Sequence, residues 1–315
     1  MNKEPLIILT GPTSVGKTSL SISLAKAVDG EIISADSMQV YKYMDIGTAK
    51  ITEDEMQGVP HYLISEFNPD EEFNVFKFQQ YAKKYIKTIR DKNKIPILVG
   101  GTGFYIQSVI YDINFEENDS DKSYRNELEG LLESKGSLYL HELLTKLDPL
   151  SAKEIHPNNG KRIIRALEYF HQTGESISVH NKEQREQESP YLYKYFVLNK
   201  DRVSLYDTIN NRVDIMIEKG LVDEVRSLKT MGYTKDLISM QGLGYKEILD
   251  YIEGNTTLDE AIEKLKRDTR HYAKRQLTWF RREKEVTWVN KDEFVDENAI
   301  LDYLLDSLRK HGIII

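Results

Sequence analysis

The segment Gly11 to Thr18, which reads GPTSVGKT, constrains this chain more than any other feature of its sequence. It matches the pattern G-x-x-x-x-G-K-[ST] in full, between the apolar run Leu6–Leu9 and a segment of helical character that continues to Val28. Strand, loop and helix in this order predict a phosphate loop, because the glycines let successive backbone N–H groups curl around a phosphate. The helix start adds its dipole and Lys17 a full positive charge. We expect a phosphate group to contact Gly11, Thr13, Ser14, Val15, Gly16, Lys17 and Thr18, with Thr18 also touching a bound Mg²⁺.

Strand and helix signals alternate along the first part of the chain. Apolar runs at Ile32–Ser34 and Ile95–Val99 are typical of strands buried on both faces of a parallel sheet, and residues 75–92 have apolar positions at helical spacing. The alternation predicts an α/β fold with a doubly wound parallel sheet of the P-loop NTPase or nucleotide-kinase type.

The pattern changes beyond Tyr111. Residues 118–188 are polar and helical in character, residues 191–198 have the composition of a strand, and the chain from Tyr206 onward is mostly helical. We therefore predict three segments: residues 1–115 as the first part of the P-loop core, 116–190 as a helical insertion, and 191–315 as the last core strand with C-terminal helices that complete the core.

The composition is that of a globular enzyme. The chain of 315 residues has 40% hydrophobic residues and no cysteine, which excludes disulfides, thiolate nucleophiles and cysteine-ligated zinc. No apolar run is long enough to span a membrane, so we expect a cytoplasmic protein without membrane contact. The net charge of −8 argues against nucleic-acid binding, but basic residues crowd into residues 264–284 and the local field decides phosphate contacts.

These patterns leave the role of Asp36 and the identity of the phosphate ligand open. Asp36 ends the second predicted strand, where it could hold Mg²⁺, act as a base in the crevice beyond the strand ends, or cap a turn. On the phosphate loop alone, a kinase or an ATPase is the default interpretation. The basic residues 264–284 are likewise compatible with a solvated helix face.

Six segments taken in order resemble one family. They are the phosphate loop, ISADSMQVY (33–41), MDIGTAK (44–50), GGTGFYI (100–106), HPNN (156–159) leading into Arg162 and Arg165, and YAKRQLTWFR (272–281). The set resembles the bacterial tRNA dimethylallyltransferases, also called tRNA isopentenyltransferases, from Pro5 to about Trp288.

The resemblance implies transfer of a dimethylallyl group from dimethylallyl diphosphate to the N6 amine of the adenine 3′ of the tRNA anticodon, with Mg²⁺ as cofactor. It implies that Asp36 is the general base, that Ser37, Met38 and Gln39 line the pocket of the flipped base, and that Thr102, Lys17 and Arg125 lie at the reacting groups. It further implies that the enzyme is a monomer and that a single chain binds the anticodon stem-loop of the tRNA. The expected tRNA contacts beyond the pocket are Lys161, Arg162, Ile163, Ile164, Arg165, Arg270, Lys274 and Arg275.

Two other functions fit parts of the sequence. An enzyme that prenylates a free adenine nucleotide would have a reduced helical insertion, whereas here the polar helical block 118–188, about 70 residues long, precedes the returning strand. A small-molecule kinase would need an arginine-bearing lid over a γ-phosphate.

Overall fold

The computed structural model describes residues 3–115 and 123–315. The chain forms two compact units, of which unit 1 comprises Met1–Ile110 and Pro190–Ile315, and unit 2 comprises Tyr111–Ser189. The predicted segment boundary at residue 116 falls among residues 116–122, which lie outside the described residues.

Unit 1 is built on a parallel sheet of six strands in the order β3-β2-β4-β1-β5-β6. The strands are β1 (Glu4–Thr10), β2 (Gly30–Ala35), β3 (His61–Tyr62), β4 (Ile95–Gly100), β5 (Tyr191–Asn199) and β6 (Val286–Asn290). Strand β1 lies at the centre, with Ile8 opposite Leu98 of β4 on one side and Tyr195 of β5 on the other. The predicted doubly wound parallel sheet is confirmed.

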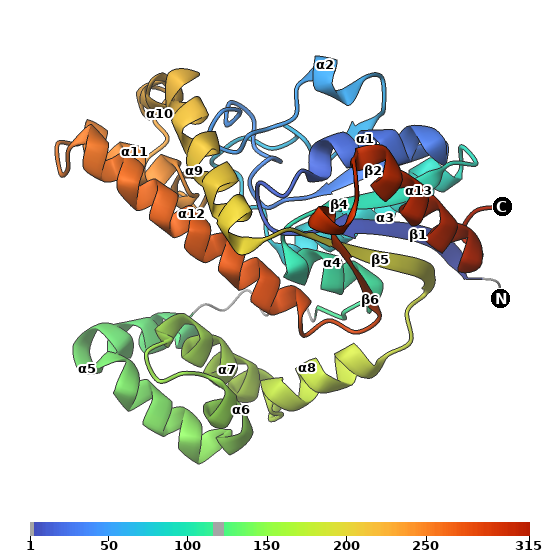
Figure 1. Ribbon diagram of the computed structural model, residues 1–315. Coiled ribbons are helices and arrows are strands. Elements are labelled where there is room, and N and C mark those ends of the chain that lie inside the picture. The colour runs from blue at the N-terminus through green and yellow to red at the C-terminus, as the bar shows by residue number, and fades with distance from the viewer. Residues whose placement is uncertain (1–2, 116–122) are drawn as a thin grey trace. The chain divides into compact units, whose positions relative to one another are not determined.

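Helices cover both faces of this sheet (Figure 1). The helices of unit 1 are α1 (Lys17–Ala27), α2 (Glu53–Met56), α3 (Val75–Arg90), α4 (Gly103–Ile110), α9 (Arg202–Glu218), α10 (Leu221–Thr230), α11 (Tyr245–Ile252), α12 (Leu258–Phe280) and α13 (Glu297–Lys310), with 3-10 turns at Ser239–Gln241 and Lys291–Glu293. Helices α1 and α13 pack together on one face, and α3 and α4 on the other. Ile7 and Leu9 of β1 are fully buried in one cluster with Leu24 and Leu304, which explains the continuous apolar run of this strand.

The prediction that residues 191–198 form the last core strand is wrong, because β6 follows it at the edge of the sheet. Strand β6 pairs with β5 through Val197 and Trp288. Only Val289 of its five residues is buried. The segment therefore lacks the continuous apolar run from which the central strands could be predicted. Strand β3, with two residues, is too short to give any pattern.

Unit 2 is helical throughout the part that the structure describes. Its helices are α5 (Ser123–Leu147), α6 (Pro149–Glu154), α7 (Gly160–Thr173) and α8 (Ile177–Glu186). Its core gathers Leu128, Leu140 and Leu144 of α5 with Ile163 and Leu167 of α7. No helix within residues 3–115 and 123–315 combines the length and the apolar character needed to cross a membrane.

Candidate active site

The candidate site lies at the carboxyl ends of three adjacent strands, where ligands bind in open α/β sheets. The phosphate loop follows β1, Asp36 follows β2, and the turn containing Thr102 follows β4. Because β2, β4 and β1 are neighbours in the sheet, the topology brings together three segments that are far apart in the sequence.

The Lys17 side chain folds back over the phosphate loop. Its Nζ donates hydrogen bonds to the backbone oxygens of Gly11 (3.0 Å) and Pro12 (2.8 Å). Burial, together with the positive charge of the Arg212 guanidinium, lowers the pKa of Lys17 from its usual 10.5 to about 7, while the Asp36 charge opposes the shift. The amine therefore lies at the loop, where the charge of a bound anion would stabilise its protonated form.

Gln276 on α12 joins the phosphate loop to the glycine-rich turn after β4. Its Oε1 accepts a hydrogen bond from the Thr13 backbone N–H, and its Nε2 donates one to the Gly101 backbone oxygen, both at 2.9 Å. A Cβ at Gly101 would lie 2.1 Å from the Gln276 Nε2, so only glycine leaves room for this bridge. Gln276 was not among the residues predicted for the site, although it belongs to the segment YAKRQLTWFR.

The Asp36 carboxylate begins the turn that follows β2. Its Oδ1 accepts hydrogen bonds from the backbone N–H groups of Met38 (2.8 Å) and Gln39 (3.3 Å). The side chain is thus fixed by its own turn, as one interpretation of the sequence foresaw, yet it also faces a cavity. The two roles are compatible, because the turn occupies one carboxylate oxygen and leaves the other for a ligand.

Asp36 opens onto a cavity of about 310 Å³ that is built by both ends of the chain. The predicted residues Thr13, Ser37, Met38 and Arg275 line it with Asp36. The sequence analysis missed the other polar residues of its wall, which are Thr48, Arg212, Gln241, Lys246, Thr269 and Tyr272.

Arg212 is the most important of the missed residues. Its Nη1 lies 3.5 Å from the Thr13 Oγ1 of the phosphate loop, and burial lowers the pKa of its guanidinium while Asp36 opposes the shift. Arg212 and Lys17 thus place two partly buried basic side chains near one carboxylate. A single arginine within an ordinary amphipathic helix, far from the motifs in sequence, carries no signal by which the sequence could have revealed it.

Thr102 and Tyr272 bring two hydroxyl groups to the same region. The Thr102 hydroxyl is buried and makes no hydrogen bond of ordinary geometry within the described residues, although the Tyr272 phenol lies near it. Burial raises the pKa of Tyr272, and the Asp36 charge raises it further. Both groups are therefore neutral donors; Tyr272 lines the cavity of Asp36, whereas the Thr102 hydroxyl is buried and does not line it.

Helix α12 divides its basic residues between two faces, so the structure does not bring the predicted set together. Arg275 lines the cavity of Asp36, whereas Lys274 lines a separate groove of about 480 Å³. Arg270 donates a hydrogen bond to the Asn210 Oδ1 at 2.6 Å and lines neither of them.

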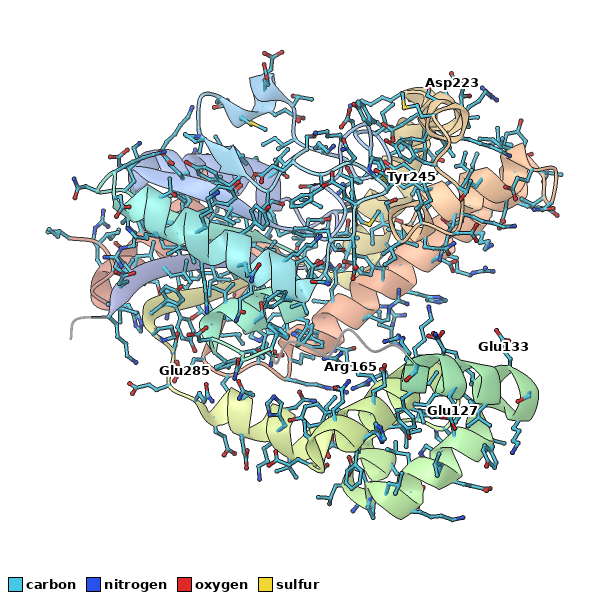
Figure 2. All side chains as sticks on the ribbon, turned by 180° about the vertical axis from the view of Figure 1, so that it is seen from behind. Glu127, Glu133, Arg165, Asp223, Tyr245 and Glu285 are labelled. Atoms are coloured by element: carbon cyan, nitrogen blue, oxygen red, sulfur yellow. The ribbon has the colours of Figure 1, made fainter. Side chains whose placement is uncertain are left out.

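Gln39, predicted to line the pocket, does not line the cavity, because its side chain bonds to the Thr48 and Ala49 backbone oxygens. Other predicted residues belong to unit 2. Arg125 pairs with Glu129 (3.0 Å) and Glu168 (3.2 Å). On α7, Lys161, Arg162 and Arg165 are exposed, while Ile163 and Ile164 are buried in the unit's core. Figure 2 labels Arg165 on this helix. Helix α7 therefore presents a basic face to solvent and uses the two isoleucines to hold that face in place.

Known proteins resemble this chain over nearly its whole length. The sequence model of the IPP transferase family matches residues 39–283. A tRNA dimethylallyltransferase of Lachnoclostridium phytofermentans is 60% identical and one of Clostridioides difficile is 54% identical; the matches cover 99% and 98% of this chain and 99% and 100% of those proteins.

Solved structures resemble the chain as well. A tRNA isopentenylpyrophosphate transferase of Bacillus halodurans superimposes with a TM-score of 0.74 at 47% identity, over 98% of both chains. A eukaryotic dimethylallyltransferase described as acting on tRNA superimposes with a TM-score of 0.78 at 30% identity, over 91% of this chain and 74% of that one. These matches confirm the resemblance predicted from the sequence, and the chain belongs to the IPP transferase family.

Proposed function

We propose that this protein transfers a dimethylallyl group from dimethylallyl diphosphate to the N6 amine of the adenine 3′ of the tRNA anticodon and releases diphosphate. The observation that carries the proposal is the cavity in which Asp36, the phosphate-loop residue Thr13 and Arg212 meet. One wall suits an anionic leaving group and another offers a carboxylate to an amine. The names of the relatives support the choice of donor and acceptor.

The diphosphate of the donor would lie on the phosphate loop. Backbone N–H groups of the loop, the Lys17 ammonium and the Arg212 guanidinium would share the charge that grows on diphosphate as the allylic C–O bond breaks. The buried Thr102 hydroxyl would donate a hydrogen bond to an oxygen of the same group. In water-poor surroundings such preorganised donors act more strongly than in bulk water.

The acceptor amine needs a base. The lone pair of an adenine amine is delocalised into the ring, so attack on the allylic carbon leaves positive charge on nitrogen until a proton departs. The free oxygen of the Asp36 carboxylate would accept that proton, a contribution typically worth about 10²–10⁴-fold in rate. The adenine must leave its stack to reach the cavity, at a cost of a few kcal/mol that is smaller in a loop than in a duplex.

We further propose Mg²⁺ as the metal. Within the described residues there is no group of three or more His, Asp or Glu side chains that would hold a metal by themselves. The Thr18 side chain is exposed at the start of α1, which fits a metal held by one hydroxyl together with diphosphate oxygens and water. Bound there, Mg²⁺ would neutralise part of the diphosphate charge.

The basic face of α7 would bind the phosphate backbone of the anticodon stem-loop. Replacing both Arg162 and Arg165 with alanine should weaken tRNA binding and lower the slope of log K against log salt by about one to two, because each lost phosphate contact removes about 0.7–0.9 from the slope. Lys153→Ala, which removes an exposed lysine from α6, is the matched control for charge alone. Unchanged tRNA affinity together with a lower melting temperature would mean that this face only stabilises unit 2.

The function is tested by incubating the protein with Mg²⁺, radiolabelled dimethylallyl diphosphate and unmodified tRNA, with AMP and ATP as parallel acceptors. We expect label in tRNA alone. Label in the free nucleotides would instead identify a nucleotide prenyltransferase, and consumption of ATP without transfer of label would identify a kinase.

A further inference from the structure

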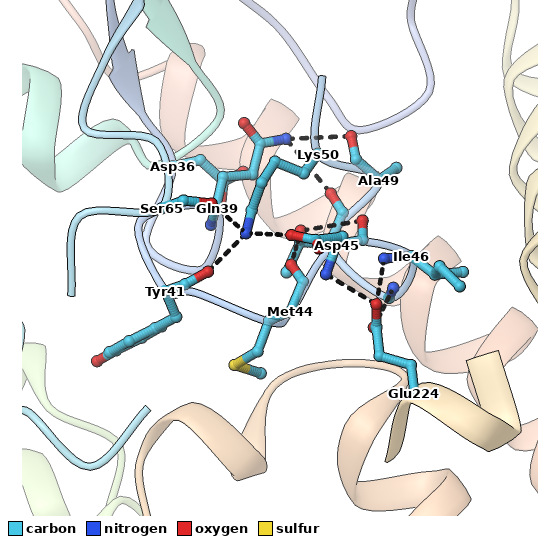
Figure 3. Close-up of polar contacts among 12 residues, drawn as sticks. Asp36, Gln39, Tyr41, Met44, Asp45, Ile46, Ala49, Lys50, Ser65 and Glu224 are labelled. Atoms are coloured by element: carbon cyan, nitrogen blue, oxygen red, sulfur yellow. Dashed lines mark hydrogen bonds and ion pairs between the residues drawn. The ribbon is translucent and has the colours of Figure 1, made fainter. Parts of the chain in front are cut away.

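A single carboxylate outside the catalytic cavity holds one of the segments that line it. The Glu224 Oε2 on α10 accepts hydrogen bonds from the backbone N–H groups of Asp45 (2.9 Å) and Ile46 (2.7 Å), and its Oε1 accepts one from that of Gly47 (3.0 Å). Figure 3 shows this carboxylate pointing into the turn of the 44–50 segment. Three consecutive N–H groups on one charged acceptor make a strong and directional attachment.

Tyr245 of α11 completes the attachment from the other side. Its hydroxyl donates a hydrogen bond to the Glu224 Oε1 at 2.7 Å. Burial raises the pKa of Tyr245 well above its usual value, and the negative charge of Glu224 raises it further, so the phenol stays protonated and remains a donor. The same ring packs on Gly47, where a Cβ would lie 2.6 Å from the Tyr245 Cζ. Only glycine allows this approach of backbone to ring.

The far end of the segment is connected to Asp36. The Gln39 Nε2 donates hydrogen bonds to the backbone oxygens of Thr48 (3.3 Å) and Ala49 (3.4 Å), while the Gln39 backbone N–H donates to the Asp36 Oδ1 (3.3 Å). Lys50 fastens the same segment to the Tyr41 backbone oxygen at 2.6 Å (Figure 3). Gly47 and Thr48 themselves line the cavity that Asp36 faces. A continuous series of hydrogen bonds thus runs from Glu224 through the segment to the Asp36 turn.

We propose that Glu224, supported by Tyr245, is a positioning residue for prenyl transfer: it holds the turn 45–48, whose residues Gly47 and Thr48 form the part of the cavity wall against which the acceptor base is placed. The inference rests on the proposed function of the cavity and adds to it a residue that touches neither substrate. The diphosphate donor binds on the phosphate loop, which makes no hydrogen bond to Glu224 within the described residues. Loss of the attachment should therefore affect the use of tRNA and spare the donor.

The test compares Glu224→Ala, Glu224→Gln and Tyr245→Phe with the wild type, measuring kcat and both KM values. For Glu224→Ala we expect kcat/KM for tRNA to fall at least tenfold while KM for dimethylallyl diphosphate stays within twofold. Glu224→Gln keeps one acceptor oxygen and Tyr245→Phe keeps the ring on Gly47, so both should show smaller losses of the same kind. Asp223→Ala is the matched control, because Asp223 is an exposed acid on the same turn of α10 and its carboxylate pairs with Arg226 rather than with the 44–50 segment in the part of the chain that the structure describes (Figure 2).

The outcomes separate the possibilities. Equal losses for tRNA and donor, or wild-type kinetics in a folded Glu224→Ala protein, would overturn the proposal. If Glu224→Ala does not fold, the milder Glu224→Gln and Tyr245→Phe variants decide by the same criterion. Failure of the wild type itself to prenylate tRNA would count against the proposed function, whereas a wild type that is active beside unaffected variants would count against the role of Glu224 alone.

Discussion

Replacing Asp36 with asparagine should lower the rate of prenyl transfer at saturating substrates by at least about 100-fold. Asparagine retains a side-chain oxygen that can accept from the Met38 backbone N–H, so the turn after β2 should survive. It loses the basicity and the negative charge with which the carboxylate takes a proton from the amine. Single-turnover kinetics with labelled donor measure the chemical step directly.

Donor binding in the same variant provides the control. Asp36 lies close enough to Lys17 and Arg212 to influence the pKa of both, so its removal takes a negative charge away from the anion site. The affinity for dimethylallyl diphosphate, measured by calorimetry, should be unchanged or higher. A single-turnover rate equal to that of the wild type would exclude Asp36 as the base and leave it the structural role of starting the turn.

The central part of the fold and the phosphate loop could be predicted because their signals are local. The apolar run of β1, the glycine spacing and Lys17 lie within a few residues of one another, and burial on both faces of the sheet dictates the composition of its central strands. Strand β6 gave no such signal, since an edge strand of five residues with one buried side chain is not forced to be apolar.

The predicted residues that line the cavity follow a strand, with the exception of Arg275 on α12. Asp36 stands directly after β2 and Thr102 stands two residues after β4, so sheet topology alone places them at one edge. Arg212 and Gln276 reach the site from helices that are distant in sequence, and Glu224 supports a segment of its wall from another; nothing in their local patterns indicates which way they point. The division of α12 into two basic faces likewise depends on what packs against each side of the helix, which only the tertiary structure shows.

Binding of dimethylallyl diphosphate should take up close to one proton at pH 8. Burial lowers the pKa of the Lys17 amine to about 7 from its usual 10.5, so most of the free protein carries a neutral amine at that pH. An anion on the phosphate loop favours the ammonium, and a phosphate group with a second pKa near 6 has little proton of its own left to exchange. Titration calorimetry in two buffers of different ionisation enthalpy reports the proton uptake.

The sign of the pH dependence follows from linkage. Affinity for the donor should fall as the pH rises above about 7, by up to about tenfold per pH unit, because each binding event must then recruit a proton. The stability of the free protein should change in the opposite direction, rising from about pH 7 towards 10.5, since the unfolded chain holds the Lys17 proton in that window and the folded chain does not.

Two variants of Lys17 separate its charge from its shape. Lys17→Met should reduce kcat/KM for the donor by about 10²–10³-fold and abolish the proton uptake, because it removes a charge aimed at the leaving group. Lys17→Arg stays charged at every pH tested, so whatever affinity it retains should be independent of pH. Wild-type protein that binds the donor without proton uptake would show that the protonation state of Lys17 does not change on binding, which would contradict a neutral amine that becomes charged by the diphosphate.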